Sequence, residues 1–166
     1  MSETQAARAI DDRASVDEFH GYYLEDLSVG LGASYAKTVT DADVVLYAGI
    51  SGDVNPIHLN QEFAAGTDFG ETIAHGMLSA SFISTVLGTK LPGPGCIYLG
   101  QSLKFRAPVR AGDTVVARVE VMSIDERRGR VVLATRCMVK DKVVIDGEAT
   151  MKVSRRDTEV ASDAAE

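Results

Sequence analysis

The sequence predicts a single α+β domain in which a curled antiparallel β-sheet wraps around one long, buried α-helix. Residues 75–91 are the most apolar long stretch, and their apolar side chains recur at the three- and four-residue spacing of a helix. From residue 96 onward, apolar and polar residues alternate with the period of a β-strand. Turn signals separate these alternating runs, so consecutive strands are expected to pair antiparallel.

The length of 166 residues suits one domain with its own core, and no repeat or low-complexity linker divides the chain. Residues 1–18 lack sustained periodicity and are expected to form a mobile arm. Residues 19–153 carry the domain. The polar residues 154–166 are expected to form a disordered acidic tail.

Composition excludes several classes of protein. The chain is 45% hydrophobic and 25% charged, as is usual for globular domains, and it has no apolar run long enough to span a membrane. The first residues lack the apolar segment of a secretory signal, and Cys96 and Cys137 lie in apolar, strand-like surroundings that favour buried thiols over a disulfide. These features favour the cytoplasm. The net charge of -7 argues against nucleic acid or anionic lipid as a partner.

The first half of the chain carries a strand and a helix with clear boundaries. Residues 33–39 suit a first strand. Thr40, followed three positions later by Asp43, resembles a capping box with Asp in place of Glu, which predicts a helix over 41–50. Gly52 can adopt the left-handed conformation that ends helices.

The rest of the chain is expected to form a short helix over 60–65, the long helix over 75–91, and then a four-strand meander. A strand ahead of a buried helix and four strands after it correspond to the hot dog fold in outline. The apolar positions that define the four strands are Ile97, Leu99, Leu103 and Phe105; Val115, Ala117, Val119 and Val121; Val131, Leu133, Cys137 and Val139; and Val143, Ile145, Ala149 and Met151.

An acid and an imidazole lie five residues apart in the stretch that links the short helices. Asp53 and His58 would point away from each other on a regular helix, but Pro56 disfavours the helical conformation at Asn55, so we expect a bend. Such a bend could bring the carboxylate and the imidazole to opposite sides of one small space. A helix-capping Asp with a solvated His explains the same residues equally well, and both interpretations stay open at this point.

The start of the long helix is the second candidate feature. A helix N-terminus offers unpaired N–H groups and a partial positive charge, and Gly76 has no side chain to keep a ligand away from them. An amide there could polarise a carbonyl, as an oxyanion hole does. The alternative role of Gly76 is close helix packing. His75 is interpreted as a structural residue that bonds its neighbours at the helix start.

Other common chemistries lack their sequence signatures. Three His and two Cys without clustered ligand spacing predict no metal site. The chain has no P-loop, no dinucleotide-binding glycine pattern and no G-x-S-x-G motif.

Residues 47–64, read as Y-A-G-I-S-G-D-V-N-P-I-H-x5-A, resemble the hydratase 2 motif of the MaoC-like (R)-specific enoyl-CoA hydratases. The resemblance continues through 74–78, 97–105 and 108–113 and covers most of 25–153. It is greatest to the single-domain PhaJ-type hydratases, which divert β-oxidation intermediates to polyhydroxyalkanoate synthesis. The fold of that family is the hot dog, in agreement with the pattern of elements.

The resemblance implies that Asp53 and His58 flank a water that adds to the trans-2 double bond of an enoyl-CoA, giving (R)-3-hydroxyacyl-CoA. Hydration needs a base and an acid near neutral pH, which suits an imidazole, and the Gly76 amide would polarise the thioester carbonyl. Asn55 would orient the water or the thioester, or else stabilise the turn. Acid–base chemistry of this kind needs no cofactor, and coenzyme A enters as part of the substrate.

The resemblance also implies a homodimer, or a higher homo-oligomer, with the substrate tunnel at the subunit interface. The acyl end would lie near Ser84 and Leu87, where bulk favours short acyl groups. Lys104, Arg106 and Arg110 are candidates to bind the CoA phosphates, against the alternative that they are ordinary exposed charges of the sheet.

Three other functions fit the same fold. The first is a 3-hydroxyacyl-ACP dehydratase of fatty acid or polyketide synthesis, although an acidic carrier protein would require a basic rim that a net charge of -7 does not suggest. A hot dog thioesterase would have little use for the Asp53/His58 motif. A non-catalytic binding module is disfavoured because Asp53, His58 and Gly76 are all present.

Overall fold

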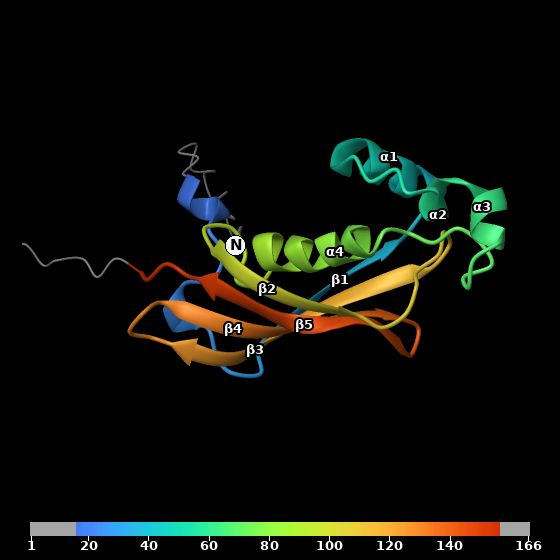
Figure 1. Ribbon diagram of the computed structural model, residues 1–166. Helices are drawn as coiled ribbons and strands as arrows, with labels where there is room; N and C mark the ends of the chain where they lie inside the picture. The colour runs from blue at the N-terminus through green and yellow to red at the C-terminus, as the bar shows by residue number, and fades with distance from the viewer. Residues whose placement is uncertain (1–15, 157–166) are drawn as a thin grey trace, which may run out of the picture.

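The computed structural model describes residues 16–156, and Figure 1 shows one long helix lying along one face of a sheet. Two short 3-10 helices, η1 and η2, precede the first strand. In chain order the elements are η1 Val16–Phe19, η2 Leu24–Asp26, β1 Gly32–Thr38, α1 Asp41–Ser51, α2 Pro56–Leu59, α3 Gln61–Ala65, α4 Gly76–Thr89, β2 Ile97–Phe105, β3 Thr114–Asp125, β4 Arg130–Val139 and β5 Lys142–Lys152.

The five strands form one antiparallel sheet in the order β1-β3-β4-β5-β2. The expected meander of four consecutive strands is therefore wrong in its first member, because β2 pairs with β5 at the far edge instead of with β3. The link between β2 and β3 spans 106–113, which is too long for a tight hairpin. Hydrogen bonds from Arg106 N to Val144 O and from Gly112 N to Val39 O hold it across the end of the sheet.

The helix α4 supplies the centre of the hydrophobic core. It packs against β1, β3 and β4, as expected for a helix with so few polar side chains. Figure 1 shows α1, α2 and α3 grouped near one end of α4, on the same side of the sheet as α4. The largest fully buried side chains of the core include Ile83, Leu87, Leu91, Leu133, Ile145 and Met151.

The capping signals of α1 are confirmed. The Thr40 hydroxyl accepts a bond from the Asp43 N–H, and the Asp43 carboxylate accepts one from the Thr40 N–H at 2.9 Å. At the other end, Gly52 has a φ of 76°, the left-handed conformation that an L side chain resists. The helix therefore stops at Ser51, and the chain turns toward Asp53.

Most of the expected arm 1–18 and tail 154–166 lies outside the described residues. Within them, Leu24 N donates to Ser154 O at 2.9 Å, and Arg156 binds both carboxylate oxygens of Asp26. The Arg156 guanidinium lowers the pKa of Asp26 below its ordinary value.

Two further expectations bear on the class of protein. Cys96 and Cys137 are free thiols, and Cys137 is buried. None of the helices in the described part of the chain combines the length and the hydropathy that a membrane span requires.

Candidate active site

The bend expected at Asn55–Pro56 is present. Asn55 caps the N-terminus of α2 by accepting a bond from Ile57 N at 3.2 Å, and Pro56 takes the first helical position, where its missing N–H costs nothing. One carboxylate oxygen of Asp53 accepts a bond from Asn55 N, also at 3.2 Å. The Asn55 side chain therefore stabilises the turn, which is one of the two roles considered for it.

His58 is half-buried and has one ring nitrogen committed to the backbone. Its Nδ1 lies 2.8 Å from the carbonyl oxygen of Ile73. Because a carbonyl oxygen only accepts hydrogen bonds, Nδ1 carries the hydrogen, and in the neutral ring Nε2 keeps its lone pair. His58 therefore has the tautomer of a general base.

His75 does more than start a helix. Its side chain makes no bond to cap α4, and its Nε2 instead lies 2.9 Å from the carbonyl oxygen of Asp53. Only 2% of His75 is exposed, and its ring centroid lies 3.8 Å from that of His58 and 5.0 Å from that of Tyr47. Sequence reasoning predicted a structural residue that bonds its neighbours, but the residue that it bonds is distant in the chain.

Asp53, His58 and His75 form one cluster. A carboxylate oxygen and one ring nitrogen of each histidine lie within 4.8 Å of one another, close enough to hold a cation or a water. Their spacing in the sequence did not suggest this, because His75 reaches the cluster from the start of α4. A carboxylate oxygen of Asp53 and Nε2 of His58 can each take a proton, and the Nε2–H of His75 is committed to the carbonyl oxygen of Asp53.

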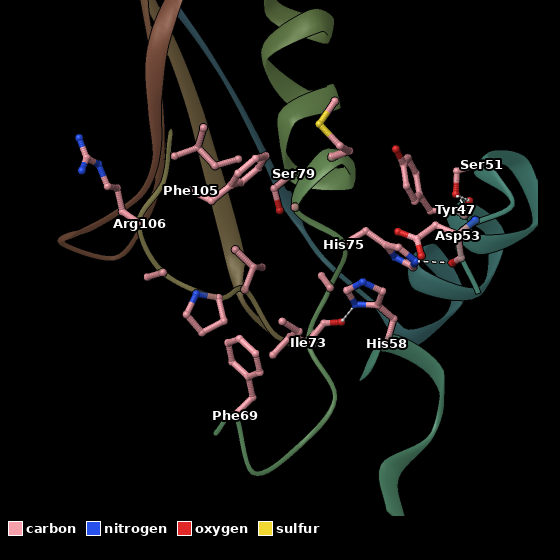
Figure 2. A pocket seen from close by; sticks show the side chains of 17 residues that line it. Tyr47, Ser51, Asp53, His58, Phe69, Ile73, His75, Ser79, Phe105 and Arg106 are labelled. Carbon is pink, nitrogen blue, oxygen red and sulfur yellow. Dashed lines mark hydrogen bonds between the residues drawn. The ribbon is translucent and has the colours of Figure 1, made fainter. Parts of the chain in front are cut away.

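The cluster forms one side of a cavity of about 690 Å³, a size suited to a small-molecule ligand. Figure 2 shows Tyr47, Asp53, His58 and His75 on one side, with Phe69, Phe105 and Arg106 opposite and Ser79 between them. The Ser79 hydroxyl is buried without a hydrogen-bond partner, and a ligand could therefore use it. The remaining lining residues are Ser51, Ile73, Ala74, Gly76, Met77, Ala107, Pro108, Val109 and Ile145.

Gly76 is the first residue of α4 and lines the same cavity. A Cβ at this position would lie 2.7 Å from Cε1 of Phe105, closer than real contacts allow. Both interpretations of Gly76 are therefore compatible with the geometry: the ring of Phe105 packs against it, and the helix start, whose first amides have no partner within the helix, lines the cavity that also contains Asp53 and His58.

The remaining candidate residues are spread more widely. Ser84 is exposed and lines a second hollow between α4 and β2, whereas Leu87 is fully buried in the core and lines neither cavity. Among the basic candidates, only Arg106 lines the main cavity, where its Nε lies 2.9 Å from a carboxylate oxygen of Asp146. Arg110 is paired with Glu71, and Lys104 lies on the outer face of the sheet.

A hot dog sheet around a helix, with an Asp/His pair at the helix start, defines a class of small-molecule enzyme. A family model described as a MaoC like domain matches residues 28–143, so the chain belongs to the MaoC-like family. It is 54% identical to the (R)-specific enoyl-CoA hydratase of Rhodospirillum rubrum over 86% of this chain and 99% of the relative. It is 52% identical to the 3-hydroxybutyryl-CoA dehydratase of Methylorubrum extorquens over 84% and 89% of the two chains.

Solved structures agree with this assignment. The R-hydratase PhaJ1 of Pseudomonas aeruginosa superposes with a TM-score of 0.77 at 43% identity, covering 81% of this chain and 87% of that one. The (R)-hydratase of A. caviae involved in PHA biosynthesis has a TM-score of 0.75 at 45% identity, with coverages of 78% and 98%. The predicted fold and the predicted family are both confirmed.

Proposed function

We propose that this protein is an (R)-specific enoyl-CoA hydratase, which adds water to a trans-2-enoyl-CoA and also catalyses the reverse dehydration. The observation that carries the proposal is the convergence of the Asp53 carboxylate, the free Nε2 of His58 and the start of α4 on one cavity. The names of its relatives support the same reaction.

In the proposed mechanism, a water lies between the Asp53 carboxylate and His58 Nε2. One of this pair takes a proton from the water while the oxygen attacks the β-carbon of the substrate. The electron pair of the double bond moves onto the thioester oxygen, which the Gly76 amide stabilises. The pair then delivers a proton to the α-carbon, and the carbonyl re-forms. The reaction forms one C–O bond and moves two protons without net oxidation or reduction, so no redox cofactor is required.

The acyl chain is proposed to run from this pair toward Ser84. Tyr47 and Met77 line both the main cavity and the second hollow beside Ser84, so the two spaces adjoin. Leu87 would not contact the acyl chain directly; it would support this part of α4 from the core, where it is fully buried. Short chains fit this arrangement, and one relative is named for a four-carbon acyl group.

A homodimer is proposed because β2 lies at an unpaired edge and carries exposed apolar side chains. Ile97, Leu99 and Phe105 are each 46–55% exposed, and the neighbouring α1 exposes Leu46 at 64% and Ile50 at 84%. A second copy laid against this edge would cover them and would extend the sheet. Light scattering should report twice 17.7 kDa, and a monomer at micromolar concentration would contradict the proposal.

The reaction is tested by measuring the hydration of crotonyl-CoA by the Asp53→Asn and His58→Ala variants. The rate is monitored as the decrease in the absorbance of the enoyl thioester. Each variant should lose about two to four orders of magnitude in kcat with its circular dichroism spectrum retained. Glu62→Gln, an exposed acid on α3 outside the cavity, is the matched control and should keep the wild-type rate. Near wild-type rates in both site variants would disprove the mechanism.

The carrier and the stereochemistry need separate measurements. Comparing the rates with crotonyl-CoA and crotonyl-ACP tests which carrier the enzyme uses. A clear preference for the ACP thioester would show that the protein is a 3-hydroxyacyl-ACP dehydratase and not an enoyl-CoA hydratase. Chiral analysis of the product should give the (R)-3-hydroxyacyl thioester, whereas an (S) product would rule out (R)-specificity.

A further inference from the structure

We propose that His75 is a positioning residue for hydration, which holds Asp53 and His58 in their working arrangement. This inference rests on the proposed function. It concerns a residue that does not itself need to touch the substrate, and it assigns the Nε2–H of His75 as the group that acts.

Few hydrogen bonds tie the loop that carries the acid–base pair to the rest of the domain. Within the described residues, three bonds join 53–58 to 73–75. Ile73 N donates to Ile57 O at 3.3 Å, His58 Nδ1 donates to Ile73 O, and His75 Nε2 donates to Asp53 O. The third is the bond at the Asp53 end, and His75 supplies it.

The segment on the other side of these bonds is rigidly placed. Ala74 is buried, and its N–H donates to Val109 O at 2.7 Å, which fixes it to the link at the end of the sheet. His75 is therefore an extension of the core that reaches the peptide of Asp53. Without it, Asp53 would be held by bonds within its own turn, from its N–H to Ser51 Oγ and from Asn55 N to its carboxylate.

The ring of His75 also supports His58. The two rings lie at an interplanar angle of 33° with centroids 3.8 Å apart, so His75 forms a wall beside the proposed base. Figure 2 shows the two side chains next to each other. An apolar ring would fill this space as well. The imidazole is the costlier choice, because its Nδ1 is buried without a partner. What the imidazole adds over a phenyl ring is the Nε2–H donor to Asp53 O.

Three substitutions separate the donor from the ring. His75→Phe keeps an aromatic wall without a donor. His75→Gln keeps an amide N–H at about the reach of Nε2 without the ring, and His75→Asn carries the same amide on a side chain too short to reach Asp53 O. A misplacement of about 1 Å at a reacting group costs about 10²-fold in rate.

We expect His75→Phe and His75→Asn to lose about 10²-fold in kcat for crotonyl-CoA, with KM within about threefold of wild type, and His75→Gln to recover at least tenfold of that loss. A merely structural role would lower Tm in all three without separating Gln from Asn. Nitrogen-15 spectra of histidine-labelled protein should show one ring with a slowly exchanging Nε2–H, which His75→Phe removes.

The outcomes distinguish the two proposals. If the wild-type protein does not hydrate crotonyl-CoA, the proposed function fails and this inference fails with it. If it does, and His75→Gln and His75→Asn are equally impaired, the positioning role of the hydrogen bond is overturned while the hydratase stands. Should His75→Phe not fold, the Gln and Asn pair decides the question alone.

Discussion

Replacing Gly76 with Pro tests whether the first amide of α4 serves the thioester. Gly76 occupies the first helical position, where the N–H has no partner within the helix and Pro is well tolerated. The preceding His75 has a ψ of 134°, which is the extended conformation that a following Pro demands. The substitution should therefore remove one N–H while leaving the helix in place.

The matched control is Gly76→Ala, which keeps the amide. Both variants introduce a Cβ that would lie 2.7 Å from Cε1 and 2.9 Å from Cδ1 of Phe105, so both force that ring to move. The steric cost is shared and largely cancels in the comparison. The loss of an oxyanion donor is worth about 2.7–4 kcal/mol, or about 10²–10³ in kcat.

The assay is the initial rate of crotonyl-CoA hydration, with circular dichroism to confirm that both variants fold. Because the Pro variant lacks this donor, we expect its kcat to be about two to three orders of magnitude below that of Gly76→Ala. A Phe105→Leu background should restore part of the activity of Gly76→Ala by relieving the clash. Equal rates in the Ala and Pro variants would refute the oxyanion role and would leave close packing as the reason for this glycine.

Three further predictions concern the scaffold. Ile83→Ala should lower the free energy of unfolding by about 2–5 kcal/mol in urea titrations, because Ile83 is 1% exposed at the centre of the core; a smaller loss would indicate collapse of the cavity. Bonds from the Thr40 N–H and hydroxyl lower the pKa of Asp43. Asp43→Ala should therefore cost ~0.3–1.5 kcal/mol at neutral pH, and the difference should vanish as the pH falls through the folded-state pKa of Asp43; a difference independent of pH would contradict this. Burial raises the pKa of Cys137 to about 12, so alkylation followed by mass spectrometry should find it unmodified until the protein unfolds.

Most of the fold could be predicted because its signals are local. The periodicity of α4, the capping box of Thr40 and Asp43, and the alternation of β3 and β4 each depend on neighbouring residues. The position of β2 does not. Its alternation is the same whichever strand it pairs with, and its place beside β5 depends on bonds such as Arg106 N to Val144 O, between residues far apart in the chain.

The candidate site divides in the same way. The bend between Asp53 and His58 could be predicted, because Pro56 restricts the residue before it. The role of His75 could not, since no local pattern specifies that its ring reaches a carbonyl 22 residues earlier. Leu87 and Ser84 were assigned together through the resemblance, but they face different surroundings: Leu87 lies in the core and Ser84 in the hollow beside β2.

The polarity of the cavity comes almost entirely from outside the sheet. The hydrogen-bonding groups of Asp53, His58 and His75 belong to the segments around α2 and the start of α4, whereas Phe105 and Ile145 on the strands contribute apolar walls. Within the described residues, one backbone hydrogen bond joins the segment 53–76 to the link 106–113, from Ala74 N to Val109 O at 2.7 Å. Because the hydrogen bonds of 53–58 run to 73–75 and not to a strand, we expect substitutions of the apolar wall residues Phe105 and Ile145 to change the shape of the cavity while these bonds are retained.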